Sequence, residues 1–219
     1  MDEPRRQILT QAMALADADG VAALSMRAVA QRLGLSSMAL YPYVGSKDGL
    51  LDGLVDLLVA DLVPTLPAGD GDGDWRERLR GLARAVRRIG HAHPGAYALM
   101  MGRPSTTPDA ARLVELLYRA LLDAGVPPPQ VPRLERLLTT LVLGFVAAEL
   151  NGRFASRHPD RGPAADAAEL PAHAALDPEL RAEVDWDAEF EADLDDGIRL
   201  IELTAATSAA RAATPVAAG

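Results

Sequence analysis

Cysteine is absent from this sequence of 219 residues, only one lysine is present, and aromatic residues make up 4% of the chain. The lack of cysteine excludes a disulfide framework and a thiolate zinc site. No apolar run approaches the roughly 20 residues that span a bilayer, and the charged start MDEPRRQIL lacks the apolar stretch of a signal peptide. We therefore expect a cytoplasmic protein that does not contact a membrane.

Strand-type patterning is missing as well. No run of alternating β-branched residues is present, whereas alanine, leucine and arginine dominate and apolar residues recur at helical spacing. This composition predicts an all-α fold. A chain of this length can bury a sizeable core and can hold one or two domains.

Residues 25–51, SMRAVAQRLGLSSMALYPYVGSKDGLL, predict two short helices joined by a tight turn. Ser25 is a suitable N-cap for the first helix. Gly34 can adopt the left-handed conformation that ends a helix, and Leu35 would then point back into the core. Two short helices with a glycine turn form the helix-turn-helix pattern, whose second helix enters the major groove of DNA. The alternative is a small helical hairpin inside some other core.

The second helix of this pair is expected to be very short. Ser36 and Ser37 would cap it, and residues 38–41 would form it. Pro42 should close it near Tyr41, because a proline disfavours the helical conformation in the residue before it.

These segments carry a resemblance to a known family. RRQILTQAMALADADG, LSMRAVAQRLGLS and ALYPYVGSKDGLL resemble the DNA-binding domain of the tetracycline-repressor (TetR) family of bacterial regulators. HPGAYALMMGRP, LVLGFVAAEL and DAEFEADLDDGIRLIE resemble the C-terminal class typified by the tetracycline repressor itself. The resemblance covers nearly the whole chain. It implies a three-helix helix-turn-helix domain in residues 1–48 and a helical ligand-binding and dimerisation domain in residues 49–219.

Periodicity and capping residues place the other elements. The expected helices are residues 4–18, 46–63, 75–90, 95–101, 108–124, 131–150 and 187–207. Helix 46–63 would connect the two domains, residues 67–74 would be a flexible linker, and residues 155–178 a long loop. Helix 131–150 is apolar almost all round and helix 187–207 has an apolar stripe, so we expect these two helices to build a homodimer as a four-helix bundle.

The net charge of −9 argues against a nucleic-acid partner when it is averaged over the whole chain. However, residues 1–48 hold five basic and five acidic residues and are neutral, so residues 49–219 carry the entire excess. Affinity for double-stranded DNA would therefore come from a few aimed contacts, helix N-termini and dimer symmetry rather than from bulk charge.

Most of the expected DNA contacts belong to the second short helix and its flanks. The single lysine, Lys47, begins a helix where its ammonium and free backbone N–H groups can meet a phosphate, as the resemblance also implies; a solvated surface lysine is the alternative. The resemblance matches Tyr41 to a phosphate-binding tyrosine. For one of the two tyrosines, Tyr41 and Tyr43, packing in the core is the alternative. The predicted DNA-binding residues are Arg27, Ser36, Ser37, Met38, Ala39, Tyr41, Tyr43 and Lys47.

A ligand pocket is expected in the middle of the C-terminal half. Methionines and sparse aromatics suit an adaptable apolar cavity with one or two polar anchors, although ordinary core is the alternative for each residue. Glu149 near Arg103 or Arg153 would be a satisfied polar group if it bound no ligand. The predicted ligand-binding residues are Tyr97, Met100, Met101, Arg103, Tyr118, Phe145 and Glu149.

Several chemistries are not supported. By resemblance, Leu99, Gly102 and Ala148 stand where the tetracycline repressor has the histidine, threonine and glutamate that hold a magnesium–drug chelate. His91 and His93 do not share a helix face, and no HExxH-type spacing exists. We expect no metal site, no cofactor and no catalytic centre.

The function predicted from the sequence is that of a ligand-responsive DNA-binding regulator. We expect a repressor that an unidentified, small and hydrophobic effector releases from a palindromic operator. The alternative is a constitutive dimeric DNA-binding protein without an effector.

Overall fold

The computed structural model describes residues 2–66, 74–154 and 170–213, and these residues form helices and no strand. The all-α prediction is confirmed. The predicted linker 67–74 lies outside the described residues except for Asp74, and so does most of the predicted loop 155–178. No helix of the described part is long and apolar enough to cross a membrane.

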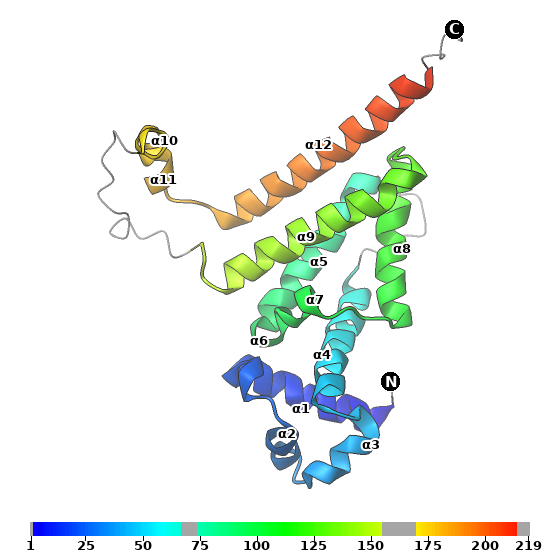
Figure 1. The fold of residues 1–219 in the computed structure, drawn as a ribbon, viewed down its shortest axis with the longest axis vertical. Helices are drawn as coiled ribbons and strands as arrows, with labels where there is room; N and C mark the ends of the chain where they lie inside the picture. Colours follow the sequence, from blue (N-terminus) through cyan, green and yellow to red (C-terminus); the bar gives the residue numbers. More distant parts are fainter. Residues whose placement is uncertain (1, 67–73, 155–169, 214–219) are drawn as a thin grey trace.

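The N-terminal helices gather at one end of the molecule, at the bottom of Figure 1. They are α1 (Glu3–Asp19), α2 (Met26–Arg32) and α3 (Tyr41–Val44), with the 3₁₀ helices η1 (Val21–Ala23) and η2 (Ser37–Leu40) between them. The long helix α4 (Lys47–Leu62) rises from this end into the rest of the molecule and continues as η3 (Val63–Thr65) (Figure 1).

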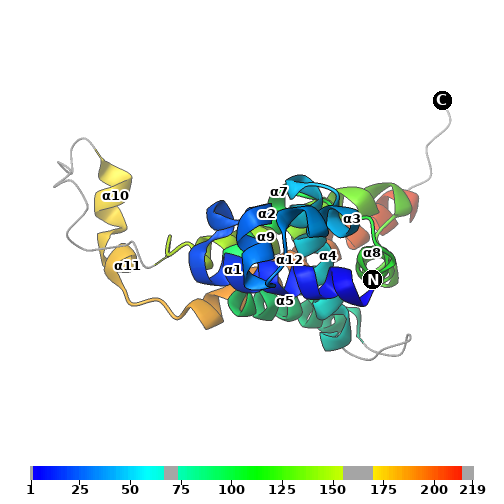
Figure 2. The same ribbon diagram turned by 90° about the horizontal axis from the view of Figure 1, so that it is seen from below.

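The remaining helices form a larger body above this end. They are α5 (Trp75–Ala92), α6 (Pro94–Tyr97), α7 (Leu99–Gly102), α8 (Pro108–Asp123), η4 (Pro128–Gln130), α9 (Val131–Leu150) and α12 (Trp186–Ala213). Two short helices, α10 (Pro171–Ala175) and α11 (Asp177–Arg181), stand away from this body in both ribbon views (Figures 1 and 2).

Local capping fixes the helix-turn-helix as the sequence predicts. The Ser25 hydroxyl accepts a hydrogen bond from the Ala28 amide at 3.0 Å, and Gly34 has a φ of +69°. The amide of Leu35 then donates to the Ala30 carbonyl at 2.9 Å, which closes the end of α2. The prediction that Leu35 points into the core is wrong, because its side chain is 50% exposed and Leu33 packs against the core instead.

The second helix differs from the prediction in two ways. It starts as η2 and continues directly as α3, so Pro42 does not close it near Tyr41. Pro42 lies in the first turn of α3, where a missing N–H costs no intrahelical hydrogen bond. Ser36 occupies the N-cap position of η2 but makes no capping hydrogen bond with its side chain.

One apolar core joins the N-terminal helices to the body. Leu9 of α1 and Leu54 and Leu58 of α4 are fully buried in it. The same core continues into α5 and α6 through Ile89 and Ala96. α4 therefore packs against both the helix-turn-helix end and the body.

The apolar stripe of α12 faces inward. Phe190, Leu194, Ile198 and Ile201 are buried against helices of the same chain, with exposed fractions between 0 and 8%. The expectation that this stripe would form an exposed patch on a monomer is therefore wrong. This face of α12 is buried because it packs against apolar side chains of α5 and α9.

Candidate nucleic-acid interface and ligand cavity

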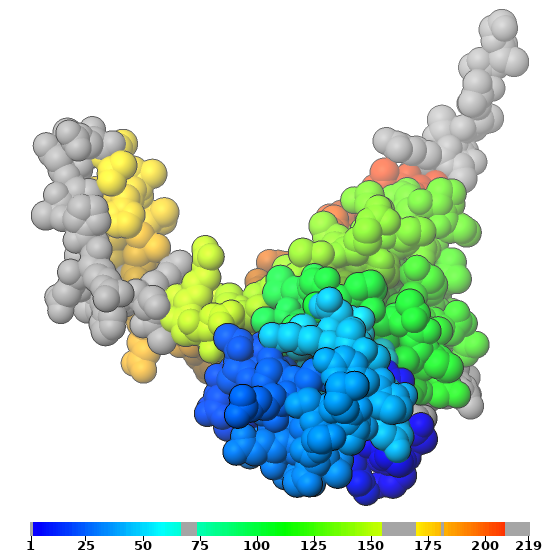
Figure 3. All heavy atoms as spheres, turned by 60° about the horizontal axis from the view of Figure 1, so that its bottom comes forward, coloured from blue at the N-terminus to red at the C-terminus, as the bar shows by residue number. Residues whose placement is uncertain are grey.

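The predicted DNA-binding residues lie on α2, η2, α3 and the start of α4, whose surface stands forward in blue tones in Figure 3. The side chain of Met38 is 73% exposed, and those of Tyr41 and Tyr43 are 42% and 41% exposed. Arg27, Ser36 and Lys47 are also exposed, whereas Ser37 and Ala39 are half-buried. Neither tyrosine belongs to the core, where Leu40 and Val44 take the inward positions.

Cations at this end fall into two groups. Arg5 and Arg6 pair with Asp56 and Asp61 of α4 at 3.7 and 3.6 Å. In the part of the chain that the structure describes, Arg27, Arg32 and Lys47 have no ion-pair partner. Sequence reasoning missed Arg32. The signal for it was the absence of an acidic residue three or four positions away, which leaves its guanidinium available to a phosphate.

The start of α4 combines features that suit a phosphate oxygen. The Ser46 hydroxyl accepts a hydrogen bond from the Gly49 amide at 3.0 Å and so caps the helix. Among the described residues, the amides of Lys47 and Asp48 have no acceptor. An exposed helix N-terminus with a lysine at its first position favours a bound anion.

Asp48 would repel a phosphate if its charge were uncompensated, but Arg103 compensates it. The guanidinium of Arg103 donates to Asp48 Oδ1 at 2.8 Å and to Asp52 Oδ1 at 2.6 Å. These two carboxylates, Asp48 first, raise the pKa of Arg103 above its usual value. Arg103 follows α7, so a residue of the body compensates the negative charge of Asp48 and Asp52 at the start of α4.

A cavity of about 410 Å³ lies between α4, α5, α8, α9 and α12. Its walls are mainly leucine and valine side chains from these five helices. The polar side chains that line it are those of Arg80, Arg103, Ser105, Glu135 and Thr139. Cavities of this size, apolar with a few polar groups, are typical of sites for small organic molecules.

Of the seven predicted ligand-binding residues, Met100 and Arg103 line this cavity and the other five do not. Met101 is 54% exposed. Tyr118 packs against a separate apolar cluster near the end of α8. Phe145 lies in an aromatic cluster, with its ring centroid 5.1 Å from that of Phe190.

Tyr97 is buried elsewhere, and Glu149 is half-buried elsewhere. Tyr97 is 1% exposed, its hydroxyl has no hydrogen-bond partner among the described residues, and burial raises its pKa. Glu149 accepts hydrogen bonds from Arg87 at 2.5 and 3.0 Å and lies 3.0 Å from His91 Nε2. Arg87, more than His91, holds the pKa of Glu149 below its usual value. The partner is therefore neither Arg103 nor Arg153.

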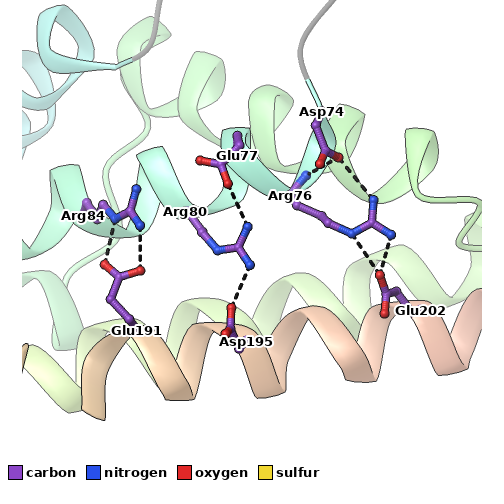
Figure 4. A network of polar contacts seen from close by, with 8 residues as sticks. All are labelled: Asp74, Arg76, Glu77, Arg80, Arg84, Glu191, Asp195 and Glu202. Carbon is purple, nitrogen blue, oxygen red and sulfur yellow. Dashed lines mark hydrogen bonds and ion pairs between the residues drawn. The ribbon is translucent and has the colours of Figure 1, made fainter. Parts of the chain in front are cut away.

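Ion pairs join α5 to α12 (Figure 4). Arg84 donates to Glu191 at 2.6 and 2.7 Å, and Arg80 donates to Asp195 at 2.7 Å. Further along, Arg76 donates to Glu202 at 2.9 Å. We call these three contacts the α5–α12 ion-pair row. The three pairs follow one another along the two helices because Arg76, Arg80 and Arg84 recur every four residues on α5 and so lie on one helix face.

A second polar contact joins the helix-turn-helix end to the body. His93 Nδ1 lies 2.8 Å from Asp17 Oδ2, and the amide of Gly95 donates to Asp17 Oδ1 at 3.2 Å. This contact and the one between His91 and Glu149 place the two histidines against different carboxylates. Within the described ranges, no group of three or more histidine or acidic side chains is arranged to hold a metal ion.

Comparison with known protein families accounts for both halves. Residues 8–54 match the family described as bacterial regulatory proteins, tetR family. Residues 66–200 match the family described as tetracyclin repressor-like, C-terminal domain.

Individual relatives agree. A "HTH-type transcriptional regulator" of Saccharopolyspora erythraea is 35% identical over 143 residues, which are 65% of this chain and 59% of that protein. The "HTH-type transcriptional repressor DrrR1" of Streptomyces coeruleorubidus is 31% identical over 151 residues, 69% of this chain and 55% of that protein. The chain thus spans a little over half of the length of these two relatives.

Among solved structures, apo ActR from Streptomyces coelicolor superimposes with a TM-score of 0.79 at 26% identity, covering 93% of this chain and 97% of that one. ActR in complex with actinorhodin has the same TM-score at 25% identity, covering 94% and 99% of the two chains. The family matches span the helix-turn-helix as well as the helices that enclose the cavity. The chain belongs to the TetR family of bacterial regulatory proteins, with an N-terminal helix-turn-helix domain and a C-terminal helical domain of the tetracycline-repressor type.

Proposed function

We propose that this chain is a homodimeric transcriptional repressor that binds a palindromic operator and that a small, mainly apolar molecule releases it. The observation that carries the proposal is Arg103. This residue lines the cavity, and its guanidinium binds Asp48 and Asp52 at the start of α4. The same turn of α4 presents Lys47, so a ligand that contacts Arg103 acts next to an expected phosphate contact.

The DNA side of the proposal rests on few contacts. Ser37 would meet a base edge, Met38 or Ala39 would meet a thymine methyl, and Tyr41, Tyr43 and Lys47 would contact phosphates. Arg27 would contact a guanine or a phosphate, and Ser36 would lie beside the backbone.

A substitution tests the phosphate contact. Lys47→Ala should weaken binding to all DNA sequences and reduce the salt slope of binding by about one unit. Arg119→Ala on α8 removes an exposed cation far from α4 and is the matched control. Wild-type affinity and salt dependence in Lys47→Ala would remove Lys47 from the interface.

The proposed homodimer uses the faces of α9 and α12 that the protomer leaves uncovered. Leu137 and Leu141 of α9 are 43% and 36% exposed, and Leu203 of α12 is 65% exposed. A two-fold axis through these helices would bury the three leucines and form a four-helix bundle. Sedimentation at micromolar concentration should give a dimer, and a stable monomer would contradict both the bundle and the palindromic operator.

Release would be a shift between two conformations. The two recognition helices of a dimer must match successive major grooves, about 34–36 Å apart. A ligand that prefers the conformation with another spacing lowers the affinity for the operator, and operator DNA lowers the affinity for the ligand by the same factor. α4 is the connecting lever because its side chains pack in the core at one end and line the cavity at the other.

Relatives support the assignment by analogy. DrrR1 is named a repressor, and ActR has been crystallised with actinorhodin and with (S)-DNPA. Catalysis forms no part of the proposal.

The test has two stages. Operator sequences are first selected from random DNA with the purified protein, and compounds are then screened for release of the selected DNA, measured by fluorescence anisotropy. Leu113→Trp should fill the cavity and abolish release while operator binding persists. Leu122→Trp, on the exposed side of the same helix, is the control and should respond as the wild type does.

The alternative is a constitutive DNA-binding protein whose body serves only for dimerisation. It predicts that no compound releases the operator and that Leu113→Trp changes nothing. Arg103→Gln adds a further distinction. In the ligand-responsive case this variant should still bind ligand, but operator DNA should change its ligand affinity less than in the wild type.

A further inference from the structure

Three charged side chains line the cavity, and two of them are already neutralised. Arg80 donates to Glu77 at 2.8 Å and to Asp195 at 2.7 Å. Arg103 is bound by two carboxylates of α4 in the same manner. A ligand would have to displace these carboxylates to use either guanidinium as an ionic anchor.

Glu135 is the remaining charged side chain, and it has no cation. It is half-buried near the start of α9, and its carboxylate accepts one hydrogen bond, from the Thr139 hydroxyl at 3.1 Å. Within the described ranges no arginine, lysine or histidine pairs with it. Its neighbours in sequence, Arg133 and Arg136, are exposed.

The direction of Glu135 follows from its place on α9. Leu138, Thr139 and Val142 lie three, four and seven residues further on and line the same cavity, which is the spacing of one helix face. The carboxylate therefore shares a wall with apolar side chains. A carboxylate in such surroundings is stabilised by a cation or a strong donor.

The charge around the cavity is negative, like that of Glu135. Each of the two lining arginines is bonded to two acidic residues, so these groups together carry a net negative charge even before Glu135 is added. Ser105, which also lines the cavity, donates to Asp56, whose carboxylate pairs with Arg5 at 3.7 Å and so adds no uncompensated charge. The whole chain carries −9. This potential attracts cations into the cavity and disfavours anions.

We propose that the effector is a lipophilic cation, an apolar body that carries a protonated amine or a quaternary ammonium, and that Glu135 is the residue that selects its charge. The inference rests on the cavity of the proposed function and deepens it. The apolar walls bind the body of the ligand, Glu135 binds the positive group, and Thr139 orients the carboxylate. An anion of the same size is excluded because it would face Glu135 without a free cation to meet it.

The experiment uses three probes with one alkyl chain and different head groups: decyltrimethylammonium, decan-1-ol and decanoate. Binding to the full-length protein without DNA is measured by calorimetry. The cation should bind about ten-fold more tightly than the alcohol, because only the cation is attracted by the charge of the half-buried Glu135 carboxylate. Decanoate should bind more weakly than both. Thermal unfolding of each protein verifies that the fold is intact.

Three variants locate the effect. Glu135→Gln should lose about ten-fold in affinity for the cation, while its affinity for the alcohol stays within about two-fold. Glu189→Gln removes an exposed carboxylate outside the cavity and should bind all three probes as the wild type does. Glu135→Asp keeps the charge and should retain part of the preference for the cation.

The outcomes separate the two proposals. Equal binding of cation and alcohol, or a preference for the cation that survives in Glu135→Gln, overturns the role of Glu135 and leaves the effector cavity intact. If the alcohol binds and Leu113→Trp blocks it, the cavity is a ligand site whatever the head group. If none of the probes binds, the effector site of the proposed function fails and this inference fails with it.

Discussion

The helices around α4 and the contact between α5 and α12 are held together by different forces. At the helix-turn-helix end, α1, α2 and α4 meet through fully buried side chains such as Leu9, Leu54 and Leu58. Along the other contact, α12 adds to its buried apolar stripe a row of arginine–carboxylate pairs, and the members of the Arg84–Glu191 pair are 44% and 41% exposed. The contact at the helix-turn-helix end is buried from solvent, and the contact between α5 and α12 is partly exposed to it.

The difference indicates which end is rigid and which end can respond. Buried apolar contacts are close-packed and resist small displacements, so the recognition helix keeps its shape. Exposed ion pairs contribute about 0–1 kcal/mol each and weaken with salt, so the ion-pair row adds little resistance to that of the buried stripe of α12. A ligand between α5, α9 and α12 would therefore move the body first, and α4 would carry the displacement to an unchanged DNA-binding unit.

Loss of packing at the rigid end should have the largest effect. Leu58→Ala removes a fully buried side chain of α4 and should lower the free energy of unfolding by about 2–5 kcal/mol, because the cavity left behind collapses only in part. Urea denaturation at fixed protein concentration measures it. Leu122→Ala, which is 48% exposed on α8, is the control and should change little. Equal losses in both variants would contradict the comparison.

The junction between the two regions should be the next most sensitive. At Gly95 a Cβ atom would overlap the backbone of Ala16, so Gly95→Ala must push α6 away from α1. We expect a loss of about 1–3 kcal/mol in the free energy of unfolding, as for other overpacked sites. Operator affinity should fall with it. Gly102→Ala, where a Cβ meets open space, should leave both quantities unchanged.

Removal of the most buried arginine should show a pH-dependent loss. Arg87 and Glu149 are 16% and 15% exposed, and Arg87→Gln should lower the free energy of unfolding by about 1.5 kcal/mol at neutral pH. The pKa of Glu149 is below its ordinary value of 4.5 in the folded protein. Its contribution is therefore complete above that value and is lost as the pH falls through the lowered pKa.

The pH profile of this variant gives a second measurement. The difference in the free energy of unfolding between the wild type and Arg87→Gln should shrink as the pH falls below 4.5. Protonated Glu149 carries no charge, so it loses its ionic interaction with the guanidinium. Arg119→Gln, whose pair with Glu115 is exposed on both sides, should show a difference near zero at every pH. A constant difference for Arg87→Gln down to strongly acidic pH would show that Glu149 is not the group concerned.

Salt should give the smallest effect and separate the two regions most directly. Arg84→Gln should cost less than about 1 kcal/mol at low salt, and this loss should fall further when salt is added, because the pair with Glu191 is exposed. The loss from Leu58→Ala should not depend on salt. If the loss from Arg84→Gln were unchanged by salt, the ion-pair row would be a packing contact and α12 would be as rigid as α4.

Local features of the fold could be predicted from the sequence. Ser25 and Ser46 cap their helices, and Gly34 takes a positive φ, because these roles depend on residues within one helical turn. The failures are also local in origin. Leu35 is exposed because Leu33 takes the core position, and Pro42 fits the first turn of a helix that was expected to end there.

The lining of the cavity was the least predictable part. Methionines and aromatics suggested its lining, but only Met100 and Arg103 of the predicted set reach the cavity. Glu149 was identified as an unusual charge, and its partner Arg87 lies 62 residues away in the sequence. Helical periodicity shows that a face is apolar, but it does not show which helix covers that face.

By itself the sequence determined the helical fold and the helix-turn-helix, because composition, spacing and capping act over short stretches of chain. Only the tertiary structure decided the inward rotation of α12, the pairing of its acidic residues with the arginines of α5, and the isolation of Glu135 in an apolar wall. These features depend on which side chains from distant segments arrive at the same place, and that placement decides which charges have a partner of opposite sign.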